Sequence, residues 1–85
     1  MKNESKQKMF DLYYALFSEF KETSQTCLLE IEKTSRNEII INFLHYHNRY
    51  MTNNKLLQIF EIYPESHERL KNHIISVMRG QVLIS

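Results

Sequence analysis

The residues best suited to chemistry in this chain are its single cysteine, Cys27, and histidines such as His47 and His67. A thiol becomes a nucleophile when a base is positioned beside it, and Cys and His side chains together are typical zinc ligands. Two leucines follow Cys27, which indicates a thiol packed in a core. The spacing of these residues matches no compact zinc motif. We therefore expect no enzymatic activity, no metal and no cofactor.

The composition is that of one small globular domain spanning residues 1–85. Apolar residues make up 42% of the chain and charged residues 25%, while a net charge of +1 favours no partner through bulk electrostatics. One glycine and one proline leave few turn-forming residues, which favours helices over hairpins. A lone cysteine and the lack of a signal segment or a long apolar run predict a soluble, cytoplasmic protein.

The N-terminal part predicts a long helix over about residues 5–33. Apolar residues recur there at intervals of three and four, and the apolar stripe is wider than one neighbouring element usually covers. Such a helix would be roughly 45 Å long, whereas a domain of this size has a radius of gyration of about 12 Å. Either the helix breaks near 23–26, or residues 5–34 pack on a second copy in a homodimer. The expected interface consists of Phe10, Tyr13, Tyr14, Phe17 and Phe20.

The rest of the chain predicts three further helices, so the expected fold class is all-α with four to five helices. Ser35 and Glu38 have the spacing of a capping box, and Pro64 and Gly80 suit the beginning and end of a last helix. The predicted helices cover about residues 36–51, 54–62 and 64–79. The apolar residues near the C-terminus form either a short strand or a tail packed on the core. His47 and His67 fall on apolar helix faces, which predicts buried imidazoles and a modest pH dependence of stability or dimerisation.

The order of these three helices resembles that of helix-turn-helix and winged-helix regulators, including dimeric ones with a long dimerising helix. The resemblance covers residues 35–84 and implies a DNA-binding transcriptional regulator whose binding unit is 35–85. Arg69, Asn72 and Ser76 would face base edges. The residues expected to contact phosphate are Arg49, Lys55, Lys71 and Arg79.

A helical protein-interaction module is the alternative function. A small regulator of the phage, plasmid or virulence type could bind a larger protein and modulate it without contacting DNA. The aromatic residues of the first helix, from Phe10 to Phe20, would then be the docking surface, since exposed aromatic residues dominate interface energies. Under both hypotheses the protein is no enzyme and uses no small-molecule substrate.

Overall fold

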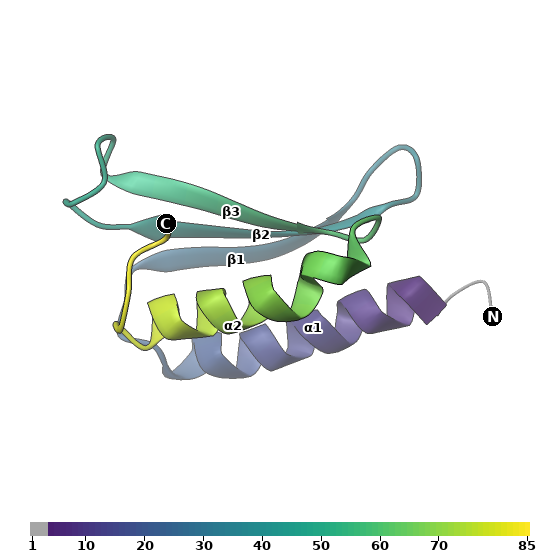
Figure 1. Ribbon diagram of the computed structural model, residues 1–85, viewed down its shortest axis with the longest axis horizontal. Coiled ribbons are helices and arrows are strands. Elements are labelled where there is room, and N and C mark those ends of the chain that lie inside the picture. The colour runs from purple at the N-terminus through teal and green to yellow at the C-terminus, as the bar shows by residue number, and fades with distance from the viewer. Residues whose placement is uncertain (1–3) are drawn as a thin grey trace.

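The protein is a two-layer α+β domain in a computed structural model that describes residues 4–85. An antiparallel sheet of three strands, in the order β1-β2-β3, is covered on one face by two α-helices that lie side by side (Figure 1). The elements are α1 (Glu4–Glu22), β1 (Cys27–Lys33), β2 (Ile39–Tyr46), β3 (Asn54–Phe60), the short 3-10 helix η1 (Pro64–Ser66) and α2 (His67–Met78).

The all-α prediction is wrong, because the regions predicted as the second and third helices form β-strands. The range 36–51 holds β2, and the range 54–62 holds β3. The predicted helix-turn-helix unit is therefore absent. The first helix also ends at Glu22 rather than near residue 33, so it does not overhang a domain whose longest extent is 42 Å.

The end of α1 lies where the sequence predicted a break, near residues 23–26. The N–H of Thr23 still bonds to the carbonyl oxygen of Glu19, whereas the Thr23 hydroxyl donates to the carbonyl oxygen of Met78 at the end of α2 and accepts from the N–H of Gln25. These side-chain bonds replace further helical turns and turn the chain towards the sheet. The segment that follows is strand β1 and not a second half of the helix.

Two asparagines, and no glycine, make the turns between the strands. Asn37 lies between β1 and β2 with φ 65°, and Asn53 lies between β2 and β3 with φ 68°. Asparagine adopts this left-handed conformation more readily than most residues. In the first turn the Thr34 hydroxyl oxygen accepts the N–H groups of Arg36 and Glu38. The pattern around Ser35 that predicted a helix start therefore belongs to a hairpin.

The last helix lies where the sequence predicted it. Pro64 begins η1, which continues directly into α2. At the other end the N–H of Gly80 bonds to the carbonyl oxygen of Val77, and the N–H of Gln81 bonds to that of Ser76. With Gly80 at φ 74°, these bonds form a Schellman motif that satisfies the last carbonyl groups of the helix.

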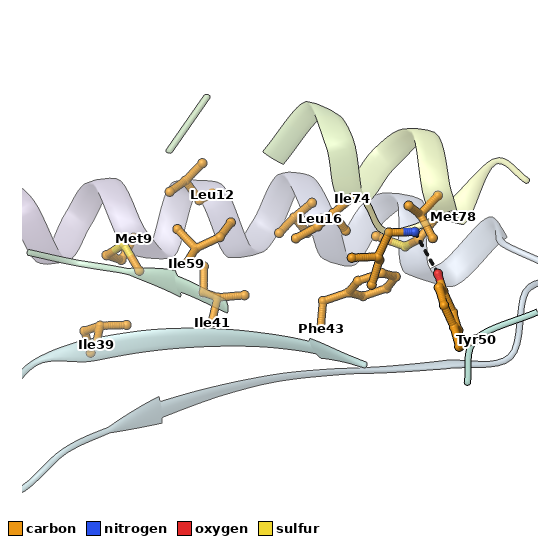
Figure 2. Packing of buried hydrophobic residues seen from close by; sticks show 12 residues of the cluster. Met9, Leu12, Leu16, Ile39, Ile41, Phe43, Tyr50, Ile59, Ile74 and Met78 are labelled. Atoms are coloured by element: carbon orange, nitrogen blue, oxygen red, sulfur yellow. Dashed lines mark hydrogen bonds between the residues drawn. The ribbon is translucent and has the colours of Figure 1, made fainter. Parts of the chain in front are cut away.

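The core lies between the helices and one face of the sheet (Figure 2). Met9, Leu12 and Leu16 of α1 are buried, with Met9 pointing towards the sheet, and Phe43 of β2 is fully buried as well. The remaining buried apolar residues are Ile39, Ile41, Tyr50, Ile59, Ile74, Val77, Met78 and Ile84. Ile84 belongs to the C-terminal tail, which confirms the alternative of an apolar tail packed on the core.

Glu61 ties the beginning of α1 to the sheet. Its carboxylate accepts hydrogen bonds from the Ser5 hydroxyl, from Lys6 Nζ at 3.1 Å and from the N–H of Ile39 at 2.9 Å. The Ser5 bond, followed by those of Ile39 and Lys6, lowers the pKa of Glu61 below its ordinary value, although burial opposes this shift. The ionised carboxylate is thus the form that the fold stabilises. Along the described residues, no helix is both long and apolar enough to cross a membrane.

Candidate functional site

The sheet face opposite the helices, here named the outer face, is left uncovered by the described residues (Figure 1). Side chains alternate between the two faces of a strand, and Ile39, Ile41 and Phe43 point to the helices. The intervening residues therefore form the outer face. Strand register aligns them in three cross-strand rows, which are Leu28-Leu44-Leu56, Glu30-Asn42-Gln58 and Glu32-Ile40-Phe60.

Apolar side chains border the outer face on both sides of a polar centre. Leu28 and Leu56 are exposed, and Leu44 between them is half-buried. Tyr46 lies exposed at the end of β2, and Ile40 and Phe60 are half-buried in the third row. Because neighbouring outer-face side chains meet across the strands, Leu28, Leu44 and Leu56 form one apolar cluster with Tyr46, and Ile40 and Phe60 form a second one beyond the polar row.

A hydrogen-bonded network fixes the centre of the outer face. Asn42 Nδ2 donates to Glu32 Oε1 at 2.7 Å and to Glu30 Oε2 at 3.2 Å. Gln58 Nε2 donates to Asn42 Oδ1 at 2.8 Å, so the amide of Asn42 is satisfied at both ends. A side chain held by several partners loses little entropy on binding, so the network prepares this surface for a ligand.

The charge of the outer face is negative. Glu30 and Glu32 are its charged residues in the described strands, and no lysine or arginine occupies an outward position there. Phosphate groups of a nucleic acid would meet two carboxylates and no cation on this surface. A complementary surface would place basic residues opposite these carboxylates.

The aromatic residues predicted as an interface lie along the side of α1 next to strand β1. Phe10, Tyr13, Tyr14 and Phe17 line a groove together with Ile31 of β1. The rings of Tyr13 and Phe17 stack with centroids 6.2 Å apart, and Lys21 Nζ lies 5.8 Å from the ring centre of Phe17. Phe20 instead packs against the core, as Tyr13 does in part. We call Phe10, Tyr13, Tyr14, Phe17 and Ile31 the aromatic groove.

The residues predicted to contact DNA are divided between two parts of the molecule. Arg69, Lys71, Asn72 and Ser76 belong to α2 and Arg79 follows it, whereas Arg49 precedes β3 and Lys55 is part of that strand. Arg79 makes two hydrogen bonds to the carboxylate of Glu19, the shorter at 2.6 Å, and Lys71 pairs with Glu68 at 2.9 Å. Two of the seven predicted contacts are therefore already paired with carboxylates within the protein.

A buried polar chain links four segments near the C-terminal end of α2. His45 Nε2 lies 2.9 Å from Gln25 Oε1, and His45 Nδ1 lies 2.8 Å from the hydroxyl of Tyr50. That hydroxyl also accepts the N–H of Ile84 at 2.7 Å, the bond drawn in Figure 2. Since Gln25 Oε1 can only accept, Nε2 carries the proton and Tyr50 donates to Nδ1. The chain therefore requires a neutral imidazole.

The environment of His45 favours this neutral form. Burial lowers the pKa of His45 below its ordinary value of 6.5, and the nearby His47 lowers it further. The histidines predicted to be buried, His47 and His67, are only half-buried. The sequence predicted buried histidines at those two positions, whereas the buried histidine of the structure is His45.

Cys27 shows no activation as a nucleophile. Partial burial raises the pKa of its thiol, which lowers the thiolate fraction at neutral pH. Among the described residues, no group of three or more His, Cys, Asp or Glu side chains is arranged to hold a metal ion.

The outer-face residues were missed in the sequence because their signal is weak. Leu28 and Leu29 interrupt the alternation in β1, and β2 is apolar on both faces, so neither strand has a clear period of two. Within β1 the usable signal is the alternation from Leu29 to Glu32.

Comparison of the chain with protein-family models, with curated proteins and with solved structures finds no match.

Proposed function

We propose that the protein is a non-enzymatic interaction module that binds another protein through the outer face of its sheet. The observation that carries the proposal is the apolar, carboxylate-bearing outer face with its fixed polar centre. Isolated apolar side chains are common on protein surfaces, whereas an exposed apolar cluster such as the row Leu28-Leu44-Leu56 is typical of an interaction site. The fitting partner presents lysine or arginine residues between apolar side chains.

The electrostatics of the outer face favour protein over nucleic acid as the partner. Binding to DNA stays a prediction from the sequence, but it has lost the helix-turn-helix on which it rested. Arg69 and Asn72 on α2 remain exposed, although Glu65 and Glu68 lie at the beginning of the same helical segment and repel phosphate. Residence in the cytoplasm is part of the proposal and is supported by the single free thiol of Cys27.

The test compares outer-face variants with a matched control in partner capture from the native host. Replacing Leu28 and Leu56 by Ser removes apolar contact area at two exposed positions, so the fold should persist. The control is Met51→Ser, which is fully exposed in the turn between β2 and β3. We expect the protein captured by the wild type to be lost with the double variant and retained with the control.

A gel-shift titration on random duplex DNA separates the two hypotheses. The proposed module should leave the duplex unshifted at 50 mM salt and about 10 μM protein, since phosphate binding would be strongest at such low salt. A shift that weakens steeply with added salt, together with protein capture unaffected by the double variant, would overturn the proposal in favour of DNA binding.

A further inference from the structure

Strand β1 has a free edge whose backbone groups can be assigned from two hydrogen bonds. The N–H of Tyr46 bonds to the carbonyl oxygen of Thr26, and the N–H of Thr34 bonds to that of Glu38. Bonded and non-bonded pairs alternate in an antiparallel ladder. The even-numbered residues of β1 therefore bond to β2, and Cys27, Leu29, Ile31 and Lys33 direct their N–H and carbonyl groups outward.

The opposite edge of the sheet is partly closed. The N–H of His47 bonds to the carbonyl oxygen of Asn53, so the odd-numbered residues of β3 bond to β2. By the same alternation, the even-numbered residues of β3 direct their backbone groups outward. His67 Nε2 of α2 bonds to the carbonyl oxygen of Phe60 at 2.7 Å and occupies one of these positions. Strand β1 carries no comparable side-chain contact among the described residues. It is unbulged over seven consecutive pairs, with no proline to block pairing.

The aromatic groove lies directly beside this free edge. Phe10 is 42% exposed, Tyr14 72% and Phe17 40%, and Ile31 of β1 forms part of the same groove. Because an aromatic side chain presents about 150–250 Å², these three rings leave roughly 300 Å² open to water. A stable interface buries about 800 Å² per partner. The rings and the unpaired strand together supply a large share of that area.

We propose that two copies of this chain form a homodimer by antiparallel pairing of their β1 edges about a two-fold axis. The sheet then becomes six-stranded, and the α1 helices bring their aromatic grooves together on the helix side. A second copy fits because antiparallel pairing of one segment with itself is symmetric, so the same strand and the same rings serve both partners. The outer face stays free, so this inference does not depend on the proposed function.

Side-chain charges select the register of the pairing. Pairing centred on Glu30 would place that carboxylate opposite its own copy, and pairing centred on Ile31 would place Glu30 opposite Glu32. Like charges directly opposite each other destabilise a sheet. Pairing centred on Leu29 avoids both, because it places Cys27 opposite Ile31 and Leu28 opposite Glu30. Pairing centred on Leu28 avoids both as well but pairs only residues 27–29 of β1, whereas pairing centred on Leu29 pairs residues 27–31. The proposed dimer therefore has Leu29 opposite Leu29.

Sedimentation of the full chain under reducing conditions tests the dimer. We expect a dimer in the range of about 1–100 μM and at least tenfold weaker association for Tyr14→Glu, which buries a charge in the interface. Met51→Glu, an exposed position in the turn beyond β2, should leave the association unchanged. A monomer at 100 μM, or equal association of wild type and Tyr14→Glu, would overturn the proposal.

Cysteine cross-linking tests the register. Opposed residues of a hydrogen-bonded pair have Cα atoms about 5.5 Å apart, within the range of a disulfide. Mild oxidation of Cys27→Ser/Leu29→Cys should give a covalent dimer, whereas Cys27→Ser/Lys55→Cys, on β3, should not. A sedimenting dimer that fails to cross-link through Leu29→Cys, or that cross-links equally through Lys55→Cys, would refute pairing through β1.

Discussion

Tyr50 holds the C-terminal tail on the core through one hydroxyl group, so Tyr50→Phe is the most informative single change. Its hydroxyl bonds to His45 Nδ1 at 2.8 Å and to the N–H of Ile84 at 2.7 Å. The variant keeps the ring and removes both bonds. A buried polar group left without a partner costs about 1–3 kcal/mol, and two groups are affected. We expect the free energy of unfolding to fall by roughly 2–6 kcal/mol.

This loss is large relative to the stability of a small domain. At about 0.05–0.15 kcal/mol per residue, the whole chain should be stable by roughly 4–13 kcal/mol. Each kcal/mol shifts Tm by about 4–8 °C in a domain of this size, so Tyr50→Phe should melt at least about 8 °C below the wild type. Urea denaturation followed by circular dichroism measures the same loss as a lower midpoint with an unchanged slope.

The matched control is Tyr46→Phe, which removes a hydroxyl from the exposed tyrosine four residues earlier. A surface change of this kind should stay within about 0.5 kcal/mol. Hydrogen exchange at the N–H of Ile84 should accelerate in Tyr50→Phe alone. If the two variants unfold at the same urea concentration, the bonded chain from Gln25 to Ile84 does not contribute as the structure indicates.

The other predictions concern pH and two single residues. The pKa of His45 is lowered in the folded protein, so below pH 6.5 the unfolded chain binds more protons than the folded one. The free energy of unfolding, measured by urea denaturation, should therefore fall as pH falls from 6.5 towards that lowered pKa. In His45→Gln this dependence on pH should disappear. The pKa of Glu61 is also lowered, so its contribution is present above 4.5 and is lost at more acid pH. Glu61→Gln should lower the free energy of unfolding at pH 7 by about 1–3 kcal/mol and flatten the acid limb of the curve, with Glu65→Gln as the exposed control. Gly80→Ala should lower the free energy of unfolding by about 1–2 kcal/mol, because Gly80 has φ 74° and an added Cβ would lie 3.1 Å from Gln25 Nε2. Thermal melting measures this loss, and an unchanged Tm would contradict it.

The sequence predicted the last helix and failed in the middle of the chain for a definable reason. The beginning of the last helix at Pro64 is confirmed. For the first helix the sequence left two alternatives, and the structure shows the break near 23–26 and not a continuous helix to about residue 33. The hairpins were missed because scarcity of glycine was taken as scarcity of turns. Asn37 and Asn53 adopt the required positive φ without glycine.

The middle of the chain also shows why periodicity misleads for a central strand. Strand β2 is paired on both edges, and it carries core residues on one face and the polar network and Leu44 on the other. A strand with apolar residues on both faces has the sequence of a continuous apolar run, which periodicity alone does not distinguish from a buried helix. The β-branched run Ile39–Ile41 was the residue-level signal for a strand.

The width of the apolar stripe on α1 retains its meaning although the helix is shorter than predicted. Met9, Leu12 and Leu16 fill the core, while Phe10, Tyr14 and Phe17 lie on the adjacent side of the helix and are exposed. Two faces with different roles were therefore read as one broad stripe. A helix that only covered a sheet would need the first face alone, and aromatic residues beside an unpaired strand carry a cost in solubility and aggregation. That cost is removed if a second copy covers the groove and pairs with the strand at the same time, which is why the edge of β1 and the rings of α1 are best tested as one interface.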